Sequence, residues 1–205
     1  MHPLVRDTRQ ALKNAANPVT AAGMQAYMKS VMPCRGVSAP LQKRLWRELF
    51  AAHPLTAHDE WRDVVLELWR GAKFREERYA AIALIDARAY KPFLSTNDLP
   101  MLEEMIVTGE WWDLVDALAT HPLGDVLRQD PGRVGRVMRK WAKSPDMWKR
   151  RAAILSQIRF KADTDLQLLY DCIEPNLADR EFFIRKAIGW ALRSLAWTNP
   201  REVKR

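Results

Sequence analysis

The sequence predicts an all-α protein, a curved stack of antiparallel helix pairs. Apolar residues recur with helical spacing along nearly all of the 205 residues, and no segment alternates convincingly as a strand does. Only 8 glycines are present, and almost all of the 12 prolines fall between the periodic runs. Because proline is tolerated at the start of a helix but not in its interior, this placement indicates many short helices separated by turns.

The expected helices follow one another with brief polar connections. They span residues 3–15, 18–31, 40–52, 57–70, 75–88, 98–108, 111–119, 132–143, 146–159, 164–174 and 180–197, and a last one begins at residue 200. Capping residues support several starts, among them residues 96–98, 144–145 and 199–200. The helix pairs differ in sequence, which favours a degenerate array of HEAT-like repeats, an α-solenoid. No linker interrupts the chain, so we expect residues 1–205 to form a single domain.

The composition indicates a folded protein with an anionic partner. The 33 Lys and Arg residues exceed the 25 Asp and Glu residues, which gives a net charge of +8, and 48% of the residues are hydrophobic. Polyanions are the natural partners of such a surface. Cys34 and Cys172 lie far apart and have no metal-ligand spacing, so we expect a reducing compartment, no metal and no cofactor.

The N-terminus does not resemble a secretory signal, and no apolar run approaches the roughly 20 residues of a membrane span. We therefore expect a bacterial-type cytoplasmic protein with no membrane partner, associated with the nucleoid if it binds DNA. A monomer is expected.

One segment, Trp111–Asp116, places two kinds of side chain on different faces of a helix. Trp111, Val115 and Leu118 form the stripe expected to be buried. Trp112 and Asp116 are four residues apart and share a face about a hundred degrees from that stripe. The helix therefore presents a tryptophan and a carboxylate that the core does not need.

A second segment, Glu181–Trp190, begins a helix with an aromatic and basic face. Its apolar stripe consists of Ile184, Ile188, Leu192 and Leu195. The opposite face carries Phe183, Lys186, Trp190, Arg193 and Trp197. Such a face on a helix that already has a core-facing stripe suggests a nucleic-acid surface.

Basic residues gather in clusters that suit phosphate groups. The clusters are Lys43, Arg44 and Arg47; Lys149, Arg150 and Arg151; Arg159 and Lys161; and Lys186 and Arg193. Each cluster alone also fits an ordinary solvated surface. Arg151 differs, because it lies in line with Leu155 and Ile158 at the edge of an apolar stripe. An unpaired cation is costly there, so Arg151 requires an anionic partner, either a protein carboxylate or a phosphate.

Four segments together resemble the AlkD-type DNA alkylation-repair glycosylases. They are Trp111–Asp116, Trp148–Leu155, Phe182–Trp190 and Thr198–Pro200, and Ala26–Lys29 resembles the N-terminal helix of that family. The resemblance runs in order from about residue 20 to the C-terminus.

The resemblance implies hydrolysis of the N-glycosidic bond of cationic alkylated purines, chiefly N7-methylguanine and N3-methyladenine, in double-stranded DNA. It implies no requirement for base flipping. By resemblance Asp116 is the catalytic carboxylate, Trp112 and Trp190 flank the sugar of the lesion, and Arg151 holds a phosphate. No lysine stands at a motif position suited to a Schiff base, which favours a monofunctional glycosylase.

The expected DNA-binding residues combine cations with two aromatic side chains. They are Arg151, Lys149, Arg150, Lys186, Arg193, Arg159, Tyr27 and Phe183. Simpler interpretations remain open: Trp112 and Tyr27 as packing residues, and Asp116 as a surface charge or the partner of Arg151. The rival function is a non-catalytic helical-repeat protein that binds a DNA structure or a protein partner.

Overall fold

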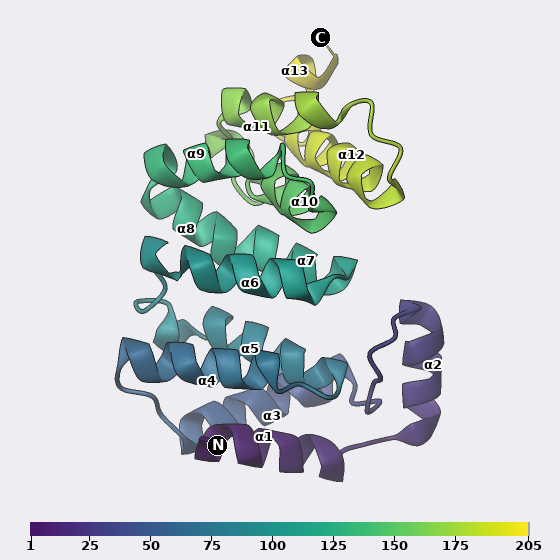
Figure 1. Ribbon diagram of the computed structural model, residues 1–205, viewed down its shortest axis with the longest axis vertical. Helices are drawn as coiled ribbons and strands as arrows, with labels where there is room; N and C mark the ends of the chain where they lie inside the picture. Colours follow the sequence, from purple (N-terminus) through teal and green to yellow (C-terminus); the bar gives the residue numbers. More distant parts are fainter. Residues whose placement is uncertain (205) are drawn as a thin grey trace. The chain divides into compact units, whose positions relative to one another are not determined.

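The structure, a computed structural model, describes residues 1–204 and contains helices and turns but no strand within that range (Figure 1). The predicted all-α class is therefore confirmed. The chain forms two compact units, Met1–Phe93 and Leu94–Arg205, and each is described by itself. Arg205, the last residue of the expected single domain, lies outside the described residues. The single domain and the curvature of the stack stay predictions.

The first unit contains five helices and a short 3₁₀ turn. They are α1 (Pro3–Asn14), α2 (Pro18–Met28), α3 (Ala39–Ala52), α4 (His58–Arg70), α5 (Arg75–Asp86) and η1 (Arg88–Tyr90). Helix α5 packs against α1, α3 and α4, and the core includes the fully buried Trp61 and Trp69. Helix α2 is drawn apart from α1, α3, α4 and α5 in Figure 1, and Met28 is its buried residue.

A buried carboxylate organises the segment between α2 and α3. Glu76 is 0% exposed and accepts hydrogen bonds from the backbone N–H groups of Arg35, Gly36 and Val37 at 2.9–3.3 Å. Gly36 has a φ of +82°, and a Cβ there would lie 2.1 Å from the carbonyl oxygen of Asn17. Glycine is therefore required where this segment meets the start of α2.

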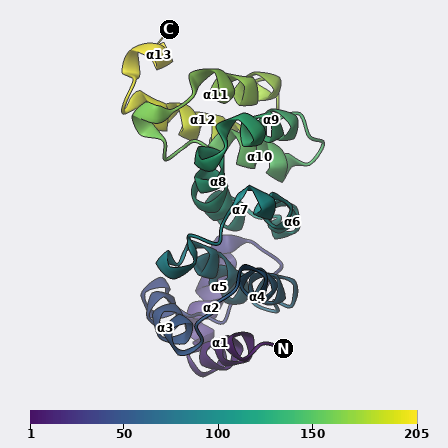
Figure 2. The same cartoon turned by 90° about the vertical axis from the view of Figure 1, so that its left-hand side faces the viewer.

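The second unit carries the remaining elements. They are η2 (Thr96–Asp98), α6 (Leu99–Gly109), α7 (Trp112–Leu118), η3 (Ala119–Leu123), α8 (Gly124–Gln129), α9 (Pro131–Trp141), α10 (Met147–Leu155), η4 (Lys161–Asp163), α11 (Leu166–Ile173), η5 (Glu174–Asn176), α12 (Phe182–Ala196) and α13 (Pro200–Lys204). Both views show α6 beside α7 and α9 beside α10 (Figure 2). Helix α10 also contacts α7 and α12.

The stretch after α7 differs from the expectation. Pro122 was expected to separate helices, but it lies inside η3, a π-helical turn that joins α7 to α8 without a break. A wider π turn tolerates a residue that has no N–H to donate. At Gly124 an added Cβ would lie 2.9 Å from the carbonyl oxygen of Ser156, so glycine permits a close approach to the segment after α10. Both residues resemble turn signals, which is why α8 was not predicted.

None of the helices in residues 1–204 combines the length and apolar character needed to cross a membrane.

The buried Glu76 generates a stability prediction. Replacing Glu76 with Ala leaves three backbone N–H groups without an acceptor, and each buried unsatisfied donor costs about 1–3 kcal/mol. We expect Glu76→Ala to lower the free energy of unfolding by at least about 3 kcal/mol in urea titrations. The control is Glu48→Ala, an exposed glutamate on α3, with an expected change below about 0.5 kcal/mol. Equal effects of the two substitutions would contradict this account.

Candidate functional site

Helix α7 begins at Trp112, so Trp112 and Asp116, four residues apart, lie on one face of it. Trp111 is extended, with φ −153° and ψ 141°, and caps the helix, so Trp112 is the first helical residue. Val115 and Leu118 are buried as expected, whereas Trp111 is half-buried. Trp112 and Asp116 are also half-buried and therefore remain accessible at the surface of the second unit.

Arg151 on α10 binds the Asp116 carboxylate with both arms of its guanidinium group. Nε donates to Oδ1 at 2.7 Å, and Nη2 donates to Oδ2 at 2.8 Å. Nη1 donates to the backbone carbonyl of Phe183, at the start of α12. Arg151 is only 4% exposed, so this cation joins α7, α10 and α12 from inside the unit. Of the two anionic partners expected for Arg151, the structure provides the carboxylate.

The environment of Asp116 works against its ionisation. Burial raises the pKa of the Asp116 carboxyl above its ordinary value, and the hydrogen bonds and charge of Arg151 oppose that rise. The nearby charge of Asp113 adds a smaller upward contribution to the same pKa. The Asp116 side chain is 15% exposed, which leaves part of the carboxylate open to a ligand. A carboxylate has about four acceptor positions, and Arg151 uses two of them.

An aromatic cluster lies where the start of α7, α10 and the start of α12 meet. The ring of Phe183 lies 5.8 Å from Trp111, 5.2 Å from Trp148 and 5.4 Å from Phe182, measured between ring centroids. Phe183, predicted to contact DNA, is thus half-buried among aromatic rings. Trp190, two turns further along α12, is 38% exposed.

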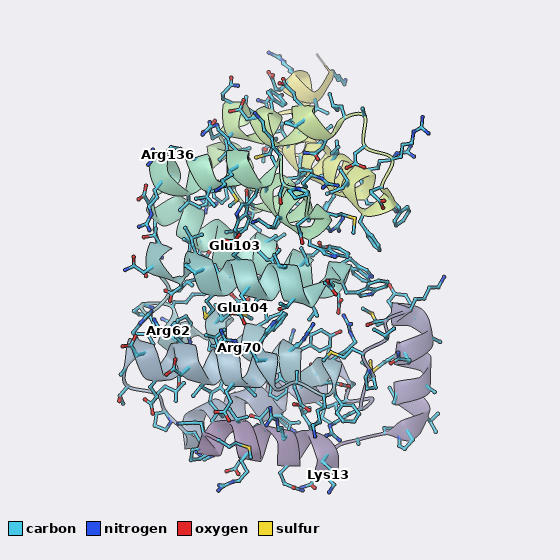
Figure 3. All side chains as sticks on the ribbon, in the orientation of Figure 1. Lys13, Arg62, Arg70, Glu103, Glu104 and Arg136 are labelled. Atoms are coloured by element: carbon cyan, nitrogen blue, oxygen red, sulfur yellow. The ribbon has the colours of Figure 1, made fainter. Side chains whose placement is uncertain are left out.

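Two of the predicted DNA-binding cations are engaged within the protein. Lys149 forms an ion pair with Glu103, labelled on α6 in Figure 3, and lies 5.4 Å from the ring of Trp141. Arg150 donates to Asp179 at 3.0 Å and to two backbone carbonyl groups of the preceding turn. The two acids lie 46 and 29 residues away in the sequence, and no local pattern links them to their partners.

Other predicted cations point outward. Lys186 and Arg193 are exposed and, with Phe182, Arg185 and Gly189, line a hollow on α12. Arg159, in the loop after α10, is exposed as well. These side chains belong to the second unit, as Asp116 does.

Tyr27 belongs to the first unit, where it lies on α2 and is 75% exposed. Lys43, Arg44 and Arg47 are exposed on α3 of that unit.

Among residues 1–204 there is no group of three or more His, Cys, Asp or Glu side chains arranged to hold a metal ion. The chemistry available at Asp116 is that of a carboxylate held by the buried Arg151, whose guanidinium also binds the backbone of Phe183 in the aromatic cluster.

The chain belongs to the family of DNA alkylation repair enzymes, whose model matches residues 8–205. It is thus an enzyme of DNA repair that acts on DNA. Similar solved structures include a predicted DNA alkylation repair enzyme from Enterococcus faecalis, which is 29% identical. The TM-score is 0.83, and the match covers 92% of this chain and 87% of that one.

The fold is also similar to the crystal structure of smu.31 from Streptococcus mutans UA159. That protein is 17% identical, with a TM-score of 0.58 and coverage of 81% of this chain and 85% of that one. No curated protein matches the sequence.

The pairing of Arg151 with Asp116 generates a stability prediction. Removing one partner of a buried ion pair leaves the other charge unpaired, which costs about 3–5 kcal/mol. We expect Arg151→Met to lower the free energy of unfolding by that amount. A further Asp116→Asn substitution should restore part of the loss, because the unpaired charge is then removed.

Urea titrations of the two single variants and the double variant measure this coupling. Arg136→Ala, at an exposed arginine labelled on α9 in Figure 3, is the control, with an expected change below about 0.5 kcal/mol. Strictly additive losses in the double variant would show that the two side chains do not stabilise each other.

Proposed function

We propose that this enzyme is a monofunctional DNA glycosylase of the AlkD type. It hydrolyses the N-glycosidic bond of cationic alkylated purines, N7-methylguanine and N3-methyladenine, in double-stranded DNA, without requiring base flipping. The observation that carries the proposal is the Asp116 carboxylate, which Arg151 holds in place one helical turn from Trp112. The family assignment supports it.

The chemistry needs little beyond a fixed anion. Alkylation of a ring nitrogen gives the purine a positive charge and makes it a good leaving group, so the base needs little protonation. The remaining task is to stabilise the oxocarbenium-like sugar and to position water. A carboxylate that is already oriented performs this task without reorganising during the reaction. The indole faces of Trp112 and Trp190 add cation–π stabilisation to the developing positive charge.

Arg151 acts in this proposal as a positioning residue. Its guanidinium has five N–H donors, and three of them are used by Asp116 and Phe183. Two donors remain, but Arg151 is only 4% exposed, so its role in this proposal is to orient Asp116, and the phosphate contact that the resemblance implies stays a prediction.

The exposed cations provide the grip on duplex DNA. Lys186, Arg193 and Arg159 are available to phosphates, whereas Lys149 and Arg150 hold the fold around Asp116 together through Glu103 and Asp179. We assign Tyr27 to a DNA contact from the first unit. A monomer bound to DNA, in the cytoplasm and at the nucleoid, completes the proposal.

Replacing the carboxylate tests the proposal directly. Asp116→Asn keeps the shape of the side chain but removes the charge that faces the developing cation. We expect release of N7-methylguanine to slow by about 10²–10³-fold, the usual effect of losing one electrostatic stabiliser. Single-turnover excision measures the rate, anisotropy measures duplex affinity, which should stay nearly unchanged, and circular dichroism verifies folding.

The matched control is Asp113→Asn, in the turn that precedes Asp116 on α7. A wild-type rate for Asp116→Asn together with a slow Asp113→Asn would identify the other carboxylate as catalytic. A wild-type protein that binds duplex DNA and releases no alkylated base would instead support the non-catalytic alternative.

The pH dependence gives a second test. Because only the ionised carboxylate stabilises a cation, excision should fall as the pH falls through the pKa of Asp116. Burial raises that pKa, so the loss of excision at low pH should occur above the ordinary Asp pKa of about 3.9. Arg151→Lys should move this loss of excision to higher pH, since Arg151 lowers this pKa. Single-turnover rates corrected for spontaneous base loss measure it, and a loss of excision at or below the ordinary Asp value would contradict the assignment.

A further inference from the structure

Helix α12 extends its aromatic face beyond the proposed lesion site. Trp197 follows Trp190 by seven residues, or about two helical turns and 10 Å along the axis. Trp197 keeps right-handed helical dihedrals, with φ −67° and ψ −26°, so it stays on the face that carries Trp190. It is 85% exposed, compared with 38% for Trp190. The proposed reaction does not use this side chain.

Trp197 borders an open hollow on the surface of the second unit. The hollow has a volume of about 850 Å³, within the usual range of roughly 300–1,000 Å³ for ligand sites. Its lining residues come from the loop after α10 and from the end of α12, and they are Ile158, Arg159, Lys161, Ser194, Trp197 and Thr198. The Ser194 hydroxyl donates to the carbonyl of Ile158 at 2.9 Å, which fixes the loop against α12.

Two cations in this hollow lack a counter-charge. Arg159 and Lys161 are exposed, and their side chains have no partner among residues 1–204. Asp163, an acid of the same turn, lies 3.5 Å from Arg128. Arg128 also lies 3.8 Å from the centroid of Phe160. The hollow therefore combines unpaired positive charge with an open indole face.

The loop that presents Lys161 has a defined backbone. Lys161 has a φ of +55°, a value that residues other than glycine seldom adopt. The hydroxyl of Thr164 donates to the carbonyl oxygen of Lys161 at 2.8 Å and stabilises the turn. Lys161 is thus presented by a structured turn beside Trp197.

We propose that Arg159, Lys161 and Trp197 form a subsite for one unpaired nucleotide of a DNA strand. The two cations bind the phosphate, and the base stacks on the indole. The base is unpaired because bases inside a duplex have both faces covered by their neighbours, whereas a single-stranded base offers a free face to an aromatic side chain. A strand that follows α12 covers the 10 Å from Trp190 in about three nucleotides at 3.4 Å each. The count of three nucleotides from the lesion rests on the proposed function of Trp190, but the subsite itself does not.

The test compares DNA molecules without alkylated bases by fluorescence anisotropy. They are a blunt duplex, the same duplex with a single-stranded tail at either its 5′ or its 3′ end, and each tailed duplex with abasic sugar-phosphates in place of the tail nucleotides. We expect the wild-type protein to bind one tailed duplex about tenfold more tightly than the abasic-tailed duplex, the usual effect of one stacked base. Trp197→Ala should bind the normal-tailed and the abasic-tailed duplex equally.

Lys161→Ala should lower the salt dependence of tailed-duplex binding by about one phosphate contact. Two controls remove similar side chains elsewhere in the unit, Leu177→Ala for an exposed apolar residue and Lys140→Ala for an exposed cation, and neither should affect the tail. Equal wild-type affinity for normal and abasic tails, or a full stacking gain retained by Trp197→Ala, would overturn the subsite.

Release of N7-methylguanine from the blunt duplex is measured in parallel. Base release without a stacking gain would overturn the subsite alone. A Trp197-dependent stacking gain without base release would support the subsite and overturn the proposed glycosylase.

Discussion

The second unit depends on one cation, the guanidinium group of Arg151. It binds both oxygen atoms of Asp116 on α7 and a backbone carbonyl at the start of α12, while its own helix, α10, contacts both. Burying an arginine is unfavourable unless its donors find partners, so these three elements are held in one mutual arrangement. The same bonds fix the direction of the carboxylate. The same hydrogen bonds therefore stabilise the unit and orient the proposed catalytic carboxylate.

The burial of Asp116 disfavours its negative charge, and this has a consequence for the proposed reaction. The positive charge of Arg151 offsets the charge of the Asp116 carboxylate, while burial raises the pKa of this carboxyl against the opposing effect of Arg151. A neutral purine leaves slowly and demands strong assistance, whereas a cationic alkylated purine leaves easily and demands little. Under the proposed function, we expect an Asp116 whose charge is offset by Arg151 to favour substrates that are already activated.

The sequence predicted the features that depend on local periodicity. Helical spacing gave the all-α class, and the four-residue spacing of Trp112 and Asp116 placed them on one face of α7. It failed at Pro122, because a π turn absorbs the proline that was expected to end a helix. It also could not show that Lys149 and Arg150 are paired, since Glu103 and Asp179 lie far away in the chain. Pairing across a fold follows from packing, which a local pattern does not encode.

The segment before α3 reverses the usual relation between helices and loops. The backbone N–H groups of Arg35, Gly36 and Val37 are bound to the buried Glu76, whereas α2 lies apart with Met28 as its buried residue. Amide hydrogens exchange with solvent when their hydrogen bonds open, and exposed helices open at low free energy. We therefore expect the amides of the connecting segment to exchange slowly with deuterium and those of α2 to exchange fast. The helix that carries Tyr27 is thus attached to the unit through a segment whose backbone is fixed by Glu76.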